Sequence, residues 1–258
     1  KDLAMVVTAP SDDETTLVRL AADAEIILTC YAFITKAVIA AASKLKAIVK
    51  YGVGTDAIDI EAATEHGVVV VNCPNYGIDT VADHAFALLM ALCRRIPELD
   101  RSMRRESWLW PETNIMGVDI SNKTLGLLGF GLIGRAMARR GVGFSMEVIS
   151  HDPYVDDALM QGMGVTPVSL DELLARSDFF SVHCVRTPET QGMLGQTEFR
   201  SMKGGAFYIN VSRGAIAQEE ALVEALDEGW IAGAGIDVFV EEPLGDGYPL
   251  LGRNNVIL

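Results

Sequence analysis

The sequence has few basic residues and no long apolar segment. Its 21 Lys and Arg residues are outnumbered by 35 Asp and Glu residues, which gives a formal net charge of −14. Nucleic acids and anionic membranes bind proteins through a basic face, so this charge argues against both partners. No apolar run reaches the ~18 residues that cross a bilayer, and the N-terminal stretch does not have the basic and then apolar pattern of a secretory signal. We therefore expect a cytoplasmic protein.

Cysteine is scarce as well. The four cysteines have no metal-ligand spacing, and most of them follow apolar or strand-like runs: Cys30, Cys73, Cys93 and Cys184. This pattern is typical of reduced core thiols in a cytoplasmic protein, so we expect no metal site. A hydrophobic content of 50% over 258 residues is enough for one large domain or two smaller ones.

Strand-like and helix-like segments alternate along the chain, which predicts a parallel α/β architecture. We expect strands at residues 4–8, 26–28, 47–49, 68–71, 124–128, 147–151, 179–183, 206–210, 231–237 and 256–258. Expected helices include one opened by a capping box at residues 11–14 and others at residues 35–42, 60–66, 133–140, 198–202 and 218–228, with a further helix capped by Ser169.

The segment 80–107 contains no strand pattern, and Pro97 interrupts its helical periodicity. Because proline is tolerated in the first turn of a helix, we expect two consecutive helices there. The prediction is an α/β fold of two Rossmann-like, doubly wound parallel-sheet units joined by hinge helices. The units comprise residues 1–74 and residues 75–258, and the hinge helices lie within residues 79–107.

The most informative motif is the G-x-G-x-x-G spacing formed by Gly129, Gly131 and Gly134, which follows a short apolar strand. The first glycine permits a tight turn, the second lets a pyrophosphate approach the backbone, and the third lets helix and strand pack closely. The N–H groups of the helix that starts at Leu132 and Ile133 would then bind the phosphates. A glycine-rich turn without a ligand is the alternative.

Asp152 ends the second strand of this unit, about 20 residues after the glycines, as the dinucleotide fingerprint requires. Its carboxylate is placed to accept hydrogen bonds from both ribose hydroxyls of an adenosine. A carboxylate would repel a 2′-phosphate, and no arginine follows within residues 151–157. The sequence therefore favours NAD over NADP.

Ligands of open parallel sheets gather at the carboxyl ends of the strands. The candidate segments there are residues 51–54, Asn75, Asp152 and residues 183–190, 210–214 and 237–242. Arg213 directly follows a buried strand, where a guanidinium can bind a carboxylate through two parallel hydrogen bonds. A surface ion pair is the alternative for this arginine.

Several ordered motifs resemble the D-isomer specific 2-hydroxyacid dehydrogenase family, closest to its 3-phosphoglycerate dehydrogenase-like branch. They are NVSRG at residues 210–214, GIDVF at 235–239 with Glu242-Pro243, GVGTD at 52–56, VADH at 81–84 and LGLLGFG at 125–131. The resemblance covers almost the whole chain. It implies an NAD-dependent oxidoreductase that moves a hydride between the nicotinamide and C2 of a D-2-hydroxy or 2-oxo acid.

The resemblance also implies roles for the substrate residues. Arg213 would bind the substrate's carboxylate and oxo group and polarise the carbonyl. The backbone N–H groups of Val53 and Gly54 would hold the carboxylate from the other unit, after closure of the cleft between the units. Lys50 occupies a position where the phosphoglycerate branch tends to carry arginine, so we expect it to face an anionic substrate tail.

Further roles concern the cofactor and the proton. Asp237 matches the residue that bonds the nicotinamide carboxamide, and Glu242 matches the carboxylate that pairs with the catalytic histidine and raises its pKa. The positions that line the cofactor, mostly through backbone or packing, are Cys184, Thr190, Val211 and Ser212.

The sequence departs from the family pattern in two respects. The catalytic histidine is expected just beyond Leu258, and none of His66, His84, His151 and His183 takes its place; each is expected to be structural. We also expect one more strand and helix before Ala4, so the sequence is interpreted as part of a longer protein, and the 258 residues alone are expected to have almost no turnover.

The second departure is Arg186, which replaces a usual apolar residue. Contact of this arginine with the pyrophosphate or a charged substrate is a hypothesis that unchanged affinities in Arg186→Ala would refute.

Two other functions fit the motifs. An NAD-sensing scaffold of the corepressor type shares this fold and retains equivalents of Arg213 and Glu242, and a formate dehydrogenase fits the Gly-Val-Gly loop less well. The resemblance also predicts a homodimer formed through the hinge helices and residues 108–110. The identity of the acid and the physiological direction do not follow from the sequence.

Overall fold

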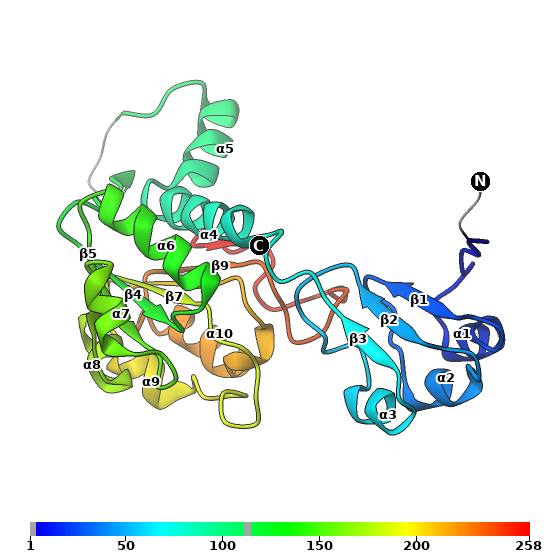
Figure 1. Cartoon of the computed structure of the whole chain (residues 1–258). Helices are drawn as coiled ribbons and strands as arrows, with labels where there is room; N and C mark the ends of the chain where they lie inside the picture. Colours follow the sequence, from blue (N-terminus) through cyan, green and yellow to red (C-terminus); the bar gives the residue numbers. More distant parts are fainter. Residues whose placement is uncertain (1–3, 111–114) are drawn as a thin grey trace. The chain divides into compact units, whose positions relative to one another are not determined.

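The computed structural model describes residues 4–110 and 115–258. The chain divides into two compact units, one ending at Ile78 and the other beginning at Asp79 (Figure 1). The prediction placed the boundary at residues 74 and 75. The assignment of the first unit to the substrate and of the second to the cofactor stays a prediction at this level.

The first unit is a three-stranded parallel sheet with the strand order β1-β2-β3. Its elements are α1 (Glu14–Ala21), β1 (Ile26–Thr29), α2 (Lys36–Ala41), β2 (Ala47–Lys50), α3 (Ile60–Glu65) and β3 (Val69–Val71). The three helices share one hydrophobic core with the central strand, in which Val38, Ile39, Ile48 and Ala62 are almost fully buried. The strands predicted at residues 26–28, 47–49 and 68–71 and the helices between them are therefore present.

Two predictions for the first unit are wrong. Residues 4–8 form no strand where the structure describes them, and they are exposed. Strand preference depends on a pairing partner, and β1 pairs with β2 rather than with this segment. The N-cap of α1 is Asp13, whose carboxylate accepts from the Thr16 N–H, whereas the Ser11 hydroxyl accepts from the N–H of Asp13 itself.

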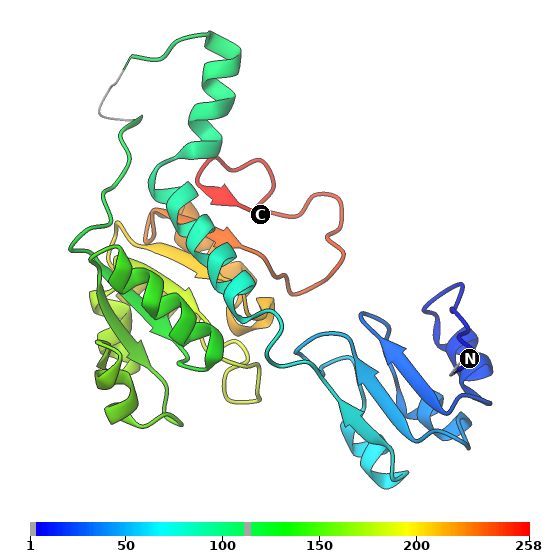
Figure 2. The same ribbon diagram turned by 45° about the horizontal axis from the view of Figure 1, so that its top comes forward.

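The second unit is a seven-stranded parallel sheet with the order β10-β9-β8-β7-β4-β5-β6 (Figure 2). Its strands are β4 (Thr124–Leu128), β5 (Glu147–His151), β6 (Thr166–Pro167), β7 (Phe179–Val182), β8 (Phe207–Asn210), β9 (Gly233–Ile236) and β10 (Val256–Ile257). The strand order reverses between β4 and β7, which is the point where doubly wound sheets bind their ligands.

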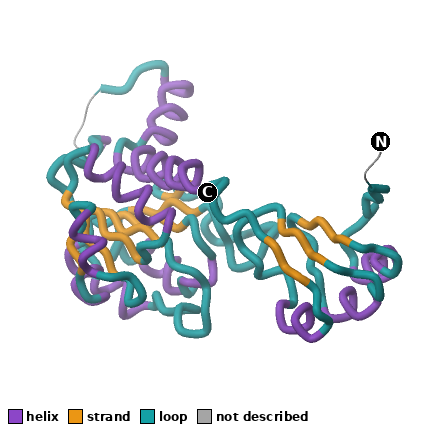
Figure 3. Tube along the Cα trace, in the orientation of Figure 1, coloured by secondary structure: helices purple, strands orange, loops and turns teal. Residues whose placement is uncertain are grey.

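Helices cover both faces of this sheet (Figure 3). The helices of this unit are α4 (Ile78–Cys93), α5 (Ile96–Glu106), α6 (Leu132–Gly143), α7 (Asp157–Gly162), α8 (Leu170–Arg176), α9 (Gln196–Ser201) and α10 (Glu219–Asp227), with a 3-10 turn at Gly214–Ile216. Helix α5 projects away from the sheet and has no buried residue (Figure 1). Two separate cores result, one against α4 and α6 and one against α8, α9 and α10. The doubly wound architecture predicted from the alternation is confirmed in this unit, whereas α7, β6 and the 3-10 turn were not predicted.

The two consecutive helices predicted within residues 80–107 are α4 and α5, and almost all of their residues belong to the second unit. Arg95 separates them with a left-handed backbone (φ 54), and Pro97 lies in the first turn of α5. Helix α6 runs past its predicted end at Arg140 to Gly143. The reason is that Gly141 serves packing: a Cβ there would lie 2.7 Å from Leu125 Cδ2.

No helix within the described residues is long and apolar enough to cross a membrane. Among the four cysteines, Cys93 is buried and the others are half-buried, so the expectation of core thiols holds fully for Cys93 alone. No cluster of potential metal ligands occurs among the described side chains.

Candidate functional site

The predicted site residues of the second unit lie on one edge of its sheet. All paired strands of this sheet run parallel, so their carboxyl ends share an edge. The loops that follow β4, β5, β7, β8 and β9 carry residues 129–134, Asp152, residues 183–190, 210–214 and 237–242. The structure therefore places these candidates on one edge of the sheet, whereas Asn75, which the prediction assigned to this unit, belongs to the first unit.

The glycines of the fingerprint have the roles that the spacing predicts. Gly129 has a left-handed backbone (φ 97), and a Cβ on it would lie 2.5 Å from the Cys184 nitrogen. A Cβ on Gly134 would lie 2.3 Å from the Gly129 carbonyl oxygen. A side chain on Gly129 would therefore push the fingerprint turn away from the loop after β7, and a side chain on Gly134 would push α6 away from that turn.

Gly131 differs from these two because its surroundings are open. It is the N-cap of α6, no described side chain caps the helix there, and no described atom lies within 4 Å of a Cβ placed on it. Leu132, the first helical residue, is 47% exposed. The N–H groups of this first turn therefore face accessible space, which suits an anionic group at a helix N-terminus.

Asp152 is tied to the fingerprint turn itself. Its Oδ2 accepts from the Phe130 N–H at 2.8 Å, and its Oδ1 accepts from the Tyr154 N–H at 3.0 Å. An ionised carboxylate has about four lone-pair sites, so these two bonds fix its direction and leave capacity for ribose hydroxyls. The same carboxylate thus orients the turn and is available to the adenosine.

The loop after β7 packs beneath that turn. His183 bonds the Ser181 hydroxyl through Nε2 at 2.9 Å, while its Nδ1 is closed off from solvent and has no hydrogen-bond partner among the described residues. Burial lowers the pKa of His183 to about 4, and burial raises the pKa of the Cys184 thiol to about 11. Both side chains are therefore neutral near pH 7.

Thr190 shapes the rest of this loop, because its hydroxyl donates to the Val185 carbonyl at 2.8 Å and accepts from the Thr187 N–H at 2.8 Å.

The loop that carries Arg213 is held by Asn210, which is buried at the end of β8. The Asn210 Oδ1 accepts from the Ser212 N–H at 3.0 Å, and its Nδ2 donates to the Arg213 carbonyl at 2.9 Å. The Ser212 hydroxyl donates to the Cys184 carbonyl, which links this loop to the one after β7. Val211, between Asn210 and Ser212, is buried in the core.

Arg213 itself is half-buried, and its Nη1 donates to the Ser212 carbonyl at 2.7 Å. The neighbouring loop after β9 is folded by Glu242, whose Oε1 accepts from the Phe239 N–H at 2.9 Å. The two loops thus present a guanidinium and a carboxylate from adjacent strands of one sheet. A guanidinium can bind and polarise an oxo acid, and a carboxylate can pair with an imidazolium.

The loop after β9 contains a contact that the sequence analysis missed. His84 on α4 places its Nε2 3.2 Å from Oδ1 of Asp237. The sequence predicts only a structural role for this histidine of the motif at residues 81–84. The signal that indicates its contact is the four-residue spacing of His84, Leu88 and Leu92, which places all three on one face of α4.

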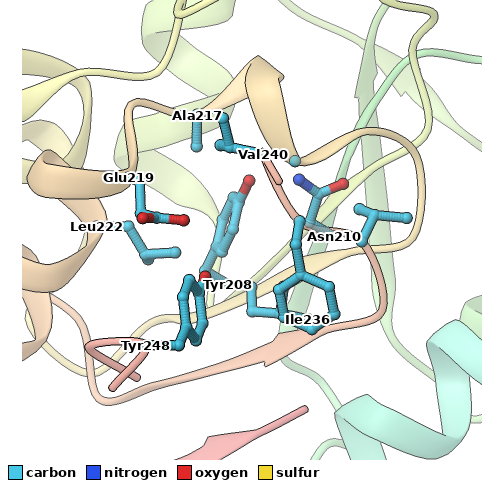
Figure 4. A pocket seen from close by; sticks show the side chains of 11 residues that line it. Tyr208, Asn210, Ala217, Glu219, Leu222, Ile236, Val240 and Tyr248 are labelled. Atoms are coloured by element: carbon cyan, nitrogen blue, oxygen red, sulfur yellow. The ribbon is translucent and has the colours of Figure 1, made fainter. Parts of the chain in front are cut away.

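A small cavity of about 20 Å³ lies below the Arg213 loop (Figure 4). It is lined by residues of β8, α10 and the loop after β9, among them Tyr208, Asn210, Glu219, Ile236, Val240 and Tyr248. The Tyr208 hydroxyl points into this space and makes no hydrogen bond with the described residues. Burial raises the pKa of the Tyr208 phenol far above its usual range, so the group is neutral.

In the first unit, Lys50, Val53 and Gly54 lie at the carboxyl edge of that unit's own sheet. The Lys50 ammonium donates to the Cys30 carbonyl and lies 5.8 Å from the centre of the Tyr31 ring. The loop at Val53 is fixed because its carbonyl accepts from Asn72 Nδ2 at 2.7 Å. These contacts orient the loop, and the expected roles of its residues remain predictions.

Residues 86–258 match the family described as D-isomer specific 2-hydroxyacid dehydrogenase, NAD binding domain. The chain belongs to this family. Its second unit contains the family's NAD-binding domain, so the expectations of a Rossmann-like fold and of NAD as cofactor are confirmed. Nothing in these similarities supports the corepressor alternative.

Individual members of the dehydrogenase family are also similar to the chain. It is 44% identical over 220 residues to a glyoxylate reductase of Korarchaeum cryptofilum, which covers 84% of this chain and 66% of that protein. It is 42% identical over 221 residues to a D-3-phosphoglycerate dehydrogenase of Mycobacterium tuberculosis, which covers 86% of this chain and 41% of that protein. The chain therefore spans less than two thirds of the length of these curated relatives.

Among solved structures, D-lactate dehydrogenase from Aquifex aeolicus, complexed with NAD and lactic acid, has a TM-score of 0.86 at 29% identity. The alignment covers 93% of this chain and 76% of that chain. The similarity extends over most of the chain and agrees with its place in the D-isomer specific 2-hydroxyacid dehydrogenase family.

Proposed function

We propose that this protein is an NAD-dependent D-2-hydroxyacid dehydrogenase with phosphoglycerate dehydrogenase-like features. The observation that carries the proposal is the alignment of the fingerprint, Asp152, the Arg213 loop and the Glu242 loop along one edge of a single sheet. When bound, NADH supplies a hydride to C2 of a 2-oxo acid. The chain's own residues have to hold the acid, stabilise the charge on its oxygen and control a proton.

The cofactor is proposed to lie along the fingerprint edge. The open first turn of α6, at Gly131 and Leu132, offers N–H groups to the pyrophosphate. Asp152 accepts the ribose hydroxyls and disfavours a 2′-phosphate because both groups are negative. The other proposed cofactor contacts are Gly129, Ile133, Gly134, Cys184, Thr190, Val211, Ser212 and Asp237.

Arg213 is the proposed catalytic cation. Its guanidinium would bind the substrate's carboxylate and oxo group, where negative charge develops as the hydride arrives at C2. Asn210 supports this role because it fixes the backbone on both sides of the arginine's Cα. Glu242 would pair with the histidine that the family resemblance places beyond Leu258, and it would hold that imidazole protonated for transfer to the alkoxide.

The first unit is proposed to supply the other substrate contacts. The N–H groups of Val53 and Gly54 would bind the substrate's carboxylate, and Lys50 would face an anionic tail. Lys50 is already engaged with the Cys30 carbonyl, so a substrate anion would have to share or replace that bond. A phosphorylated tail, with two negative charges, is better able to do so than an uncharged one.

The test is to follow NADH absorbance with the full-length protein and a panel of 2-oxo acids that includes 3-phosphohydroxypyruvate, hydroxypyruvate, glyoxylate and pyruvate. We expect oxidation with at least one acid, and a loss of about 10³-fold in kcat/KM in Arg213→Ala while NADH still binds. Lys50→Met should raise KM for the phosphorylated acid and leave KM for glyoxylate unchanged. Tight NADH binding without turnover on any acid would refute the proposed activity.

A cytoplasmic homodimer is part of the same proposal. No residue of helix α5 is fully buried within the described chain. Trp108 and Trp110, which follow it, are 62% and 74% exposed. Both features support a partner surface at the hinge helices, as the resemblance predicts. Light scattering on the full-length protein should give twice the monomer mass, and the double change Trp108→Ser, Trp110→Ser should reduce it.

A further inference from the structure

His84 and Asp237 are brought together from distant parts of the sequence. His84 belongs to α4, the helix that opens the second unit, and Asp237 follows β9 near the other end of the chain. The His84 Nε2 lies 3.2 Å from Asp237 Oδ1, and both side chains are about half exposed, at 49% and 48%. Half exposure leaves the Asp237 carboxylate accessible to a ligand while one of its oxygens is in contact with the imidazole.

The packing of α4 on β9 explains this contact. A Cβ on Gly235 would lie 3.0 Å from Leu88 Cβ and 3.2 Å from Leu92 Cδ1, so the glycine lets the helix approach the strand closely. One helical turn before Leu88 is His84, on the same face of the helix. Asp237 comes two residues after Gly235 and directly follows the end of β9, and its N–H still pairs with the Asn210 carbonyl of the neighbouring strand β8. The contact therefore follows from a glycine-dependent helix–strand packing, rather than from a chance meeting of surface side chains.

Both partners are held by the surrounding structure. The Asp237 N–H donates to the Asn210 carbonyl at 3.0 Å, which ties its backbone to the residue that supports Arg213. On the other side, Arg140 of the fingerprint helix α6 donates through Nε to Asp83, the residue before His84, at 2.8 Å. Arg139 of α6 also pairs with Asp79, in the first turn of α4, at 3.3 Å. The His84–Asp237 contact thus connects the cofactor-binding helix with the loop after β9.

We propose that His84 is a positioning residue for the nicotinamide end of the cofactor. This inference rests on the proposed function, in which Asp237 accepts a hydrogen bond from the nicotinamide carboxamide. A half-exposed aspartate samples several side-chain rotamers, and the contact with His84 Nε2 at 3.2 Å favours the rotamer that binds. Preorganisation of this kind reduces the ordering cost of binding.

The expected effect on binding affinity is specific to the nicotinamide half of the cofactor. ADP-ribose contains the adenosine and pyrophosphate of NADH and lacks the nicotinamide. Loss of the His84–Asp237 contact should therefore weaken binding of NADH and leave binding of ADP-ribose unchanged. A carboxamide that is held less firmly also lets the ring present its other face, so the stereospecificity of hydride transfer should decrease.

The experiment measures Kd for NADH and for ADP-ribose by calorimetry on the full-length protein and its variants. In His84→Ala we expect Kd for NADH to increase about 3- to 10-fold, with Kd for ADP-ribose within 1.5-fold of the wild type. In His84→Gln, whose amide can donate from a position close to that of Nε2, we expect most of the NADH affinity to return. In the Asp237→Ala background, His84→Ala should have no further effect, because the acceptor is gone. With NADH deuterated at one C4 position, His84→Ala should distribute the label between product and cofactor.

A matched control is His66→Ala, which removes a histidine of the first unit whose Nδ1 contacts the Ala62 carbonyl. It should leave both affinities unchanged. Equal weakening of NADH and ADP-ribose in His84→Ala, or no weakening of either, would overturn the inference and leave the proposed function intact. Failure of the wild-type protein to bind NADH would instead refute the proposed function, and the inference with it.

Discussion

Gly214 lies against the backbone of Phe239 so closely that a Cβ on the glycine would be 2.1 Å from the Phe239 carbonyl carbon. Gly214 directly follows Arg213, and Phe239 donates its N–H to the Glu242 carboxylate. The loop with the proposed catalytic arginine and the loop with the proposed catalytic carboxylate are therefore in backbone contact. The distance between these two loops depends on the absence of a side chain at Gly214.

Gly214→Ala should force these two loops apart. Because the atoms that a Cβ would meet are backbone atoms, which yield less easily than a flexible side chain, we expect kcat/KM to fall at least 100-fold, with a loss of stability of about 1–3 kcal/mol. NADH affinity should change much less than turnover. The control is Gly204→Ala, where no described atom lies within 4 Å of the new Cβ. Steady-state kinetics and urea unfolding check both variants, and normal turnover in Gly214→Ala would contradict the arrangement.

Asp152→Asn tests the preference for NAD over NADP. The substitution retains one oxygen that can accept from the Phe130 N–H and loses the bond from the Tyr154 N–H, so the turn should survive with one of its two bonds. It removes the negative charge that opposes a 2′-phosphate, and it adds an N–H₂ group that can donate to one. We expect the ratio of kcat/KM for NADH to that for NADPH to fall about tenfold, which corresponds to about 1.4 kcal/mol. An unchanged ratio would show that another residue makes the distinction.

The sequence predicted those parts of the fold and site that depend on local chemistry. The roles of Gly129 and Gly134 follow from backbone sterics at a fixed spacing, and both appear in the structure. The position of Arg213 shortly after a buried strand also follows from the apolar run that precedes it in the sequence. Such features are encoded within a few residues, and they were predicted correctly.

Features that depend on distant partners were predicted less well. Residues 4–8 have a strand-like composition, but no strand forms there in the described structure, since composition does not reveal whether a neighbour is available for pairing. Gly141 was interpreted as a helix end, whereas its lack of a side chain accommodates Leu125 of β4. The contact of His84 with Asp237 requires the packing of α4 on β9, which no local pattern contains.

Tyr208→Phe tests the small cavity below the Arg213 loop. The phenol ring packs against Phe180 and Phe199, with ring centres 6.2 and 5.4 Å away, and phenylalanine preserves these contacts. The hydroxyl has no hydrogen-bond partner among the described residues, and a buried unpaired hydroxyl costs about 1–3 kcal/mol. We therefore expect Tyr208→Phe to be as stable as the wild type or more stable in urea unfolding. A loss of more than about 1 kcal/mol would show that the hydroxyl is hydrogen-bonded in solution.

His183 should make the protein less stable in mild acid. Burial lowers its pKa from the ordinary 6.5 to about 4 in the folded state. Between these two values the unfolded chain binds a proton that the folded chain does not bind. The free energy of unfolding therefore rises with pH across this window and falls as the pH is lowered through it.

The measurement is the urea unfolding free energy of the wild type and of His183→Gln at several pH values from 4 to 7.5. Glutamine retains a group that can bond the Ser181 hydroxyl, and it does not titrate. Carboxylates contribute to acid destabilisation in both proteins, so the difference between the two curves isolates His183. We expect that difference to change by on the order of 2 kcal/mol in favour of the variant as the pH falls from about 6.5 to about 4. Parallel curves would mean that the ring under the fingerprint turn accepts a proton in the folded protein, and that this part of the cofactor site is more open to water than the packing of Gly129 and Gly134 indicates.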